Sequence, residues 1–139
     1  MIDTDGECVE WNFPAEANAV RTARHAVRDT LRTWRIDPAV GDLTVLLVSE
    51  LVTNSLRYAS GPIGVRLVHL RPEPGGDAHR PALLVEVSDP LPDPPTERPA
   101  GPDDEGGRGL QLVAGSARSW GTRKGRTGKT VWFELALPG

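Results

Sequence analysis

The chain has 139 residues, of which 38% are hydrophobic and 25% charged, and this size and composition are typical of one globular domain. Its formal net charge is −3 and it contains one cysteine, Cys8, which excludes an intrachain disulfide and a cysteine-cluster zinc site. Nucleic-acid binders normally carry a basic stripe. The basic cluster at 118–129 is interpreted instead as a solvated turn, so we expect no direct nucleic-acid binding.

Targeting signals are the next feature. The first residues lack the basic and then apolar pattern of a secretion signal. The longest strongly apolar run, 43–52, is interrupted by Thr44, Ser49 and Glu50, and a membrane span needs about 20 apolar residues. We therefore expect a cytoplasmic protein that does not cross a membrane.

The first half of the chain predicts one strand and two helices. Apolar and polar residues alternate over 9–13, which indicates a half-buried strand. Apolar residues recur every three or four positions over 15–34, which predicts an amphipathic helix with an arginine-rich outer face. Asp37-Pro38 begins a second helix that runs to about Ala59.

The middle of the chain predicts two strands and a long loop. The strands cover 64–71 and 82–88 and are joined through Gly75-Gly76. Six prolines fall between Asp89 and Asp104, where neither a helix nor a central strand can form. Long loops inside compact domains are often functional lids. A short helix is predicted to begin near Gly109.

The end of the chain predicts a strand around 120–121, a turn at 125–128 and a clear alternating strand at 131–137. Together the elements predict a single α+β domain over 1–139. We expect a two-layer sandwich in which helices cover one face of a mainly antiparallel mixed sheet.

Two polar residues in the second helix are candidates for chemistry. Glu50 and Asn54 are four positions apart, so both lie on one helical face. An amide oxygen is a ligand that suits Mg²⁺, and a nearby carboxylate can orient or deprotonate a hydroxyl or a water. A solvent-exposed pair of helical side chains would show the same spacing.

Glycines precede the predicted short helix in the sequence Gly106-Gly107-Arg108-Gly109-Leu110. Backbone N–H groups of glycines can turn towards a ligand, and a helix N-terminus favours anions. The Lys-Ser/Thr pair of the P-loop does not follow, so this is not that motif. A flexible hinge explains the glycines equally well.

Two further features lie at strand ends. Asp89 directly follows a buried strand, where its carboxylate could accept a hydrogen bond from an exocyclic amine such as that of adenine. Most aspartates at such a position cap a turn. Gly128-Lys129-Thr130 places a hydroxyl beside a tight turn, and a hairpin corner is the simpler interpretation.

The order and spacing of these parts are more specific than any one of them. From about residue 10 to 137 the chain resembles the GHKL ATPase superfamily. The signature Ser49-Glu50-Leu51-Val52-Thr53-Asn54 and the ending 128–135 are most similar to the stand-alone anti-sigma-factor serine kinases.

The resemblance implies ATP and Mg²⁺ as cofactors and a role for each matching residue. Asn54 would coordinate magnesium, and Glu50 would be the general base. Asp89 would bind the adenine amino group, and Thr130 would support adenine through a water. The phosphates would meet the backbone of the glycine turn, and the lid would span about 89–107. The turn residues concerned are Gly107, Arg108, Gly109 and Leu110.

The resemblance also implies partners. The expected activity is ATP-dependent phosphorylation of a serine or threonine in a small antagonist protein, with a sigma factor bound in competition and a homodimer as the assembly. The ATPase half of a histidine kinase is less expected, because no phosphoacceptor helix precedes the domain.

One departure from the family pattern keeps an alternative open. The family's first glycine box reads D-x-G-x-G, whereas this chain has Asp89-Pro90-Leu91-Pro92-Asp93. The loss of both glycines favours a non-catalytic module that senses nucleotide or binds a partner.

Overall fold

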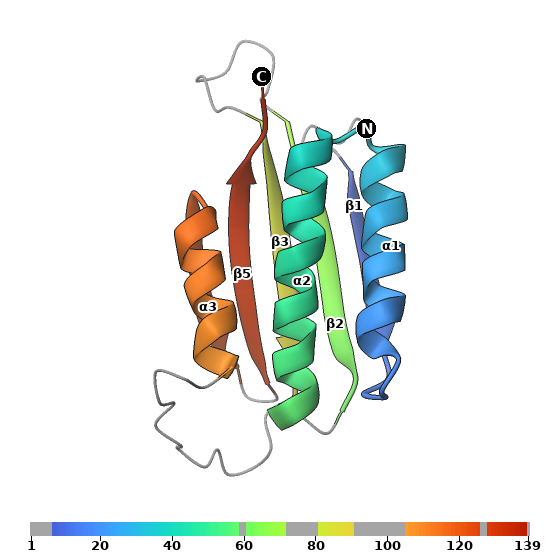
Figure 1. Cartoon of the computed structure of the whole chain (residues 1–139), viewed down its shortest axis with the longest axis vertical. Helices are drawn as coiled ribbons and strands as arrows, with labels where there is room; N and C mark the ends of the chain where they lie inside the picture. Colours follow the sequence, from blue (N-terminus) through green and yellow to red (C-terminus); the bar gives the residue numbers. More distant parts are fainter. Residues whose placement is uncertain (1–6, 59–60, 72–80, 91–104, 126–127, 139) are drawn as a thin grey trace.

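The computed structural model describes residues 7–58, 61–71, 81–90, 105–125 and 128–138. Three helices lie side by side on one face of a five-stranded sheet, as the prediction of a two-layer α+β sandwich required (Figure 1). The strand order is β1-β2-β3-β5-β4, and all four pairings are antiparallel, so the described sheet is antiparallel throughout and not mixed. The elements are β1 (Cys8–Phe13), α1 (Ala19–Thr33), α2 (Pro38–Tyr58), β2 (Ile63–Leu70), β3 (Ala82–Asp89), α3 (Glu105–Ser116), β4 (Ser119–Lys124) and β5 (Lys129–Ala136).

Helix α1 begins at Ala19, four residues after the predicted start. The backbone first forms tight turns, in which the amide of Glu16 bonds the carbonyl of Pro14 at 2.8 Å and the amide of Ala19 bonds that of Glu16 at 2.9 Å. The apolar stripe then packs into the core as the periodicity predicted, and it consists of Ala19, Ala23, Val27 and Leu31. At the other end Arg35 takes a left-handed conformation (φ 57°), a common way to end a helix.

Helix α2 begins as the Asp37-Pro38 signal predicts. The Asp37 carboxylate accepts hydrogen bonds from the amides of Ala39 at 3.1 Å and Val40 at 3.4 Å. Further along, three hydroxyls each donate to the carbonyl four residues earlier at 2.7 Å, which satisfies polar groups inside an apolar helix; they belong to Thr44, Ser49 and Thr53.

The apolar content of α2 has a structural explanation. Pro38–Arg57 is long and apolar enough to cross a membrane by length and composition alone, with a hydropathy of 1.3. Its most buried side chains, however, pack in the core between the helical layer and the sheet, where they meet Phe133 and the inner faces of β2 and β3. The core side chains of α2 are Val45, Leu47, Val48, Leu51 and Val52.

Aromatic residues of the first half belong to this core and its border. Trp11 stacks on Phe13 with ring centroids 6.3 Å apart, and Trp34 stacks on His69 at 6.0 Å. Burial, followed by the nearby Arg71, lowers the pKa of His69. Both tryptophans are partly buried and pack against the core.

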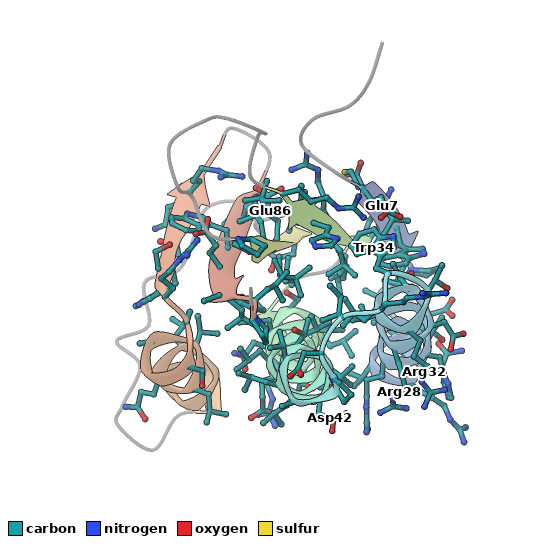
Figure 2. All side chains as sticks on the ribbon, turned by 90° about the horizontal axis from the view of Figure 1, so that it is seen from above. Glu7, Arg28, Arg32, Trp34, Asp42 and Glu86 are labelled. Carbon is teal, nitrogen blue, oxygen red and sulfur yellow. The ribbon has the colours of Figure 1, made fainter. Side chains whose placement is uncertain are left out.

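The opposite face of the sheet carries several charged side chains, and none of the described helices covers it. Glu86 lies there, on the side of the sheet away from the helices (Figure 2). It accepts hydrogen bonds from Arg66 at 2.8 Å and Arg123 at 2.6 Å, and its side chain is 12% exposed. Burial alone would raise the pKa of Glu86, but the hydrogen bonds from Arg123 and Arg66 outweigh burial and hold the pKa below its usual value.

This arrangement predicts a pH-dependent contribution to stability. A carboxyl whose pKa is lower in the folded state stabilises the fold above its unfolded pKa of about 4.3, and the contribution is lost as pH falls through the folded pKa. We expect Glu86→Gln to lower the free energy of unfolding at pH 7 by about 1–2 kcal/mol, since the arginines are solvent-screened. In urea denaturation, the difference in the free energy of unfolding between wild type and Glu86→Gln should disappear below pH 4.

The exposed Glu10, on the same face, provides the matched control. Glu10→Gln should leave stability within about 0.5 kcal/mol of wild type at either pH. If Glu86→Gln lowered the free energy of unfolding by the same amount at pH 7 and at pH 3, the role given to the two arginines would be contradicted.

Four chain segments meet at one end of the molecule. The end of β3, the start of β5, the C-terminal end of α2 and the N-terminal end of α3 lie together there (Figure 1). Helix α3 begins at Glu105, whereas the sequence predicted a start near Gly109 and a lid to 107. Asp89 belongs to β3, so the connection is 90–104, and most of it (91–104) lies outside the described residues.

Candidate functional site

A buried carboxylate marks the end where these segments meet. Asp89 is 7% exposed and lies on the helical side of β3, in the same alternation as Val85 and Val87. Ser55 of α2, 5% exposed, donates its hydroxyl proton to Asp89 Oδ2 at 2.6 Å. The hydrogen bond fixes the orientation of the carboxylate and joins α2 to the sheet.

Ser55 is a residue that sequence reasoning missed. A signal for it existed, because it is a polar residue within the buried stripe of α2, directly after Asn54. Buried hydroxyls need a partner. The sequence alone could not indicate that this partner would be Asp89, which is 34 residues further along the chain.

The two predicted polar residues of α2 lie next to Ser55. Successive helical residues point about 100° apart, so Asn54 lies beside Ser55 and one turn after Glu50. Both Glu50 and Asn54 are half-buried, and α2 packs against α3 as well as against the sheet. The structure therefore places Glu50 and Asn54 in the C-terminal half of α2, the half of the helix in which Ser55 contacts Asp89.

Glycines on both sides allow close approach to the Asp89-Pro90 backbone. A Cβ on Gly128 would lie 2.2 Å from the carbonyl oxygen of Asp89, and a Cβ on Gly61 would lie 2.5 Å from Cγ of Pro90. Pro90, directly after Asp89, is thus accommodated by a glycine on the α2–β2 connection. Leu91 and Asp93, which stand at the two glycine positions of the family's D-x-G-x-G box, lie outside the described residues.

The structure does not bring Thr130 together with the Asp89 carboxylate. Its hydroxyl lies 2.7 Å from that of Ser88, and the two share the uncovered face of the sheet. Side chains of adjacent strand residues point to opposite faces, so Thr130 is on the other side of the sheet from the Asp89 carboxylate. The residue paired with Asp89 across the two strands is Lys129.

The glycine turn is also placed differently from the prediction. Gly107, Arg108 and Gly109 form part of the first turns of α3, where their backbone is helical. The N-terminus of α3 faces the same end of the domain as Asp89 (Figure 1). Leu110, predicted to contribute to the ligand site, packs against the hydrophobic core.

A hollow of about 560 Å³ lies on the uncovered face, behind Asp89. Arg66, Glu86 and Arg123 line it together with the Ser88–Thr130 hydroxyl pair, while Glu50 and Asn54 do not. It is therefore separate from the helical side on which the Asp89 carboxylate and Ser55 meet.

The donor set near α2 suits a magnesium ion held by few protein ligands. Within the described ranges no group of three His, Cys, Asp or Glu side chains could hold a metal. Mg²⁺ commonly takes one or two protein oxygens and completes its shell with phosphate oxygens and water. The side-chain amide of Asn54 provides one such oxygen.

Comparison with known families agrees with this geometry. The family model of the histidine kinase-like ATPase domain matches residues 13–135. The chain belongs to this family. The match begins at the last residue of β1 and ends within β5, so it includes both helices of the site and both strands that meet at Asp89.

A solved structure supports the fold. The domain is similar to the crystal structure of the RsbU and RsbW domains of Rv1364c from Mycobacterium tuberculosis, with a TM-score of 0.68 and 20% sequence identity. The match covers 94% of this chain and 32% of that chain, so this chain spans about a third of its length. No curated protein matches the chain.

Proposed function

We propose that this histidine kinase-like ATPase domain binds Mg-ATP and acts as a serine/threonine protein kinase of the anti-sigma-factor type. Its substrate would be a small antagonist protein in the cytoplasm, with a sigma factor as the competing partner and a homodimer as the assembly. The observation that carries nucleotide binding is the buried Ser55–Asp89 hydrogen bond, because it presents an oriented carboxylate beside the helix that bears Asn54.

Asp89 and Ser55 would select the base. Ser55 donates to Oδ2, which leaves Oδ1 of Asp89 to accept a hydrogen bond from an exocyclic amine. Adenine presents an amine at that position and guanine a carbonyl oxygen, which a carboxylate repels. A site that needs a donor rejects the analogue that lacks it. This pair therefore supports recognition of ATP over GTP.

Asn54, Glu50 and α3 would serve the phosphate end. Asn54 would bind the metal, and the N-terminus of α3 would favour the negative charge of the phosphates. ATP supplies the phosphoryl group when it is bound. Glu50, one turn before Asn54, would accept the proton of the attacking hydroxyl. Phosphoryl transfer depends mainly on such positioning and charge neutralisation.

Removal of the general base tests the catalytic part of the proposal. We expect Glu50→Gln to lower transfer of radiolabelled phosphate from ATP to a cognate antagonist protein by about 10²–10⁴-fold. ATP affinity should stay within about three-fold of wild type, since the amide conserves the shape of the side chain. The exposed Glu16, before α1, provides the control variant Glu16→Gln, which should transfer normally.

The second candidate function is a non-catalytic nucleotide-sensing or partner-binding module of the same fold. The two glycines missing after Asp89 favour it, because Leu91 and Asp93 stand at their positions and only glycine lets the backbone approach a ligand without a Cβ. ATP binding without transfer to any antagonist, and with Glu50→Gln indistinguishable from wild type, would decide for this module and against the kinase.

A further inference from the structure

Two groups of arginines in the described part of the chain differ in their ion pairing. Those on the sheet are paired, as Arg66 and Arg123 bind Glu86, Arg71 binds Glu7 at 2.6 Å, and Arg118 binds Glu134. Five others follow α1 and its C-terminal end, and none of them forms an ion pair with a residue that the structure describes. These five, the α1 arginine stripe, are Arg21, Arg24, Arg28, Arg32 and Arg35.

The stripe is a continuous face. Its first four members are spaced by three, four and four residues, which places them on one side of the helix. Figure 2 shows Arg28 and Arg32 on the outer side of the helical layer, away from the sheet. The helix of 15 residues is about 22 Å long. A chain with a formal net charge of −3 thus concentrates unpaired positive charge along one helix.

An apolar side chain lies on the neighbouring helix. Leu46 of α2 is 49% exposed, although the adjacent Val45 and Leu47 are buried. It follows Asp42 by one helical turn, and Asp42 projects from the same outer side as the stripe (Figure 2). The two helices are in contact there, as a Cβ on Gly41 would lie 4.0 Å from Cδ1 of Leu31.

We propose that the α1 arginine stripe, with Leu46 beside it, is a docking surface for an acidic protein segment that carries an apolar residue. Guanidinium groups bind carboxylates through two parallel hydrogen bonds, and unlike the sheet arginines these form no ion pair with a carboxylate of the described residues. Charge complementarity of this kind guides partner choice and association rate, while an apolar anchor adds affinity. The surface lies on the outside of the helical layer and goes beyond the nucleotide site.

Two other classes of partner fit less well. An amphipathic helix that binds a membrane inserts its apolar face, but the apolar face of α1 is buried in the core through Ala23, Val27 and Leu31. Nucleic acid would meet two carboxylates, which repel phosphates: the exposed Asp29 next to Arg28 in α1, and Asp42 on the same outer side (Figure 2). An acidic protein segment can place its carboxylates against the arginines and keep them away from Asp29 and Asp42.

Binding of defined probes to the full chain tests the surface. The probes are a fluorescent glutamate 20-mer, the same peptide with one leucine per helical turn, a 20-base-pair DNA duplex and phosphatidylserine vesicles. We expect both peptides to bind, and the leucine-containing peptide to bind about five-fold more tightly, or about 1 kcal/mol. The combined Arg24→Gln, Arg28→Gln and Arg32→Gln variant should weaken both by at least about ten-fold, because the three guanidinium partners are lost.

Controls separate the surface from general charge effects and from nucleotide binding. Arg71→Gln removes a paired arginine of the sheet and should leave peptide affinity unchanged, whereas Leu46→Ser should abolish only the advantage of the leucine peptide. Asn54→Ala should bind both peptides normally, so failure of ATP binding would not affect the result. No peptide binding, equal binding by the triple variant, or tighter binding of duplex or vesicles would overturn the proposal.

Discussion

Asn54→Ala is expected to remove the magnesium dependence of ATP binding. The side-chain amide of Asn54 is the group of α2 that we propose binds the metal, and alanine conserves the helix while deleting that oxygen. With one protein ligand gone, the metal no longer links the phosphates to the helix. Titration calorimetry should show an affinity lower by about 100-fold, close to 3 kcal/mol, and equal with and without Mg²⁺.

The matched control is Asn18→Ala. Asn18 is exposed, precedes α1 and makes no side-chain capping hydrogen bond, so its loss should change neither affinity nor the response to magnesium. Thermal unfolding of both variants identifies any general loss of structure. An Asn54→Ala protein that is folded and still binds ATP in a magnesium-dependent manner would count against the role given to this residue.

Gly128→Ala is expected to disturb the same site from the sheet side. The added Cβ would lie 2.2 Å from the carbonyl oxygen and 3.1 Å from the carbonyl carbon of Asp89, and both belong to the backbone. Because backbone atoms cannot rotate away, β3 and β5 must separate where Asp89 pairs with Lys129. Overpacking of this kind costs about 1–3 kcal/mol or more, and it would displace the carboxylate that Ser55 orients.

Gly115→Ala provides a control with the same chemical change. Gly115 lies in α3 and a Cβ there would meet nothing within 4 Å, so the substitution should stabilise the helix by about 0.5–1 kcal/mol. Urea denaturation of the two variants should therefore give opposite signs relative to wild type. A Gly128→Ala protein as stable as wild type and with unchanged ATP affinity would show that the close approach to Asp89 is not required.

Much of the fold was predictable because its signals are local. The alternation in β1 and β5, the periodicity of α1 and the Asp37-Pro38 start of α2 each depend on neighbours within a few residues. The structure differs from the sequence prediction where a helix and an irregular backbone conformation are close in free energy. The segment before Ala19 forms turns although its composition permits a helix, and α3 begins at Glu105 although glycines are poor helix formers.

The candidate site was predictable to the extent that it depends on residue type and order. Glu50 and Asn54 lie in α2 and Asp89 ends β3, and both placements follow from local signals, the helical spacing and the strand end. Ser55 and Thr130 depend on long-range register, which the sequence does not contain. Whether Thr130 shares a face with Asp89 depends on the exact pairing of β3 with β5, and a shift of one residue reverses it.

A crystal structure of the domain with magnesium and a non-hydrolysable ATP analogue tests the central claim most directly. We predict that the adenine amine donates to Asp89 while Ser55 keeps Oδ2, that the metal contacts the Asn54 amide oxygen, and that the phosphates lie near the N-terminus of α3. An analogue bound instead in the hollow on the uncovered face, with Asp89 contacting Ser55 alone, would contradict the account.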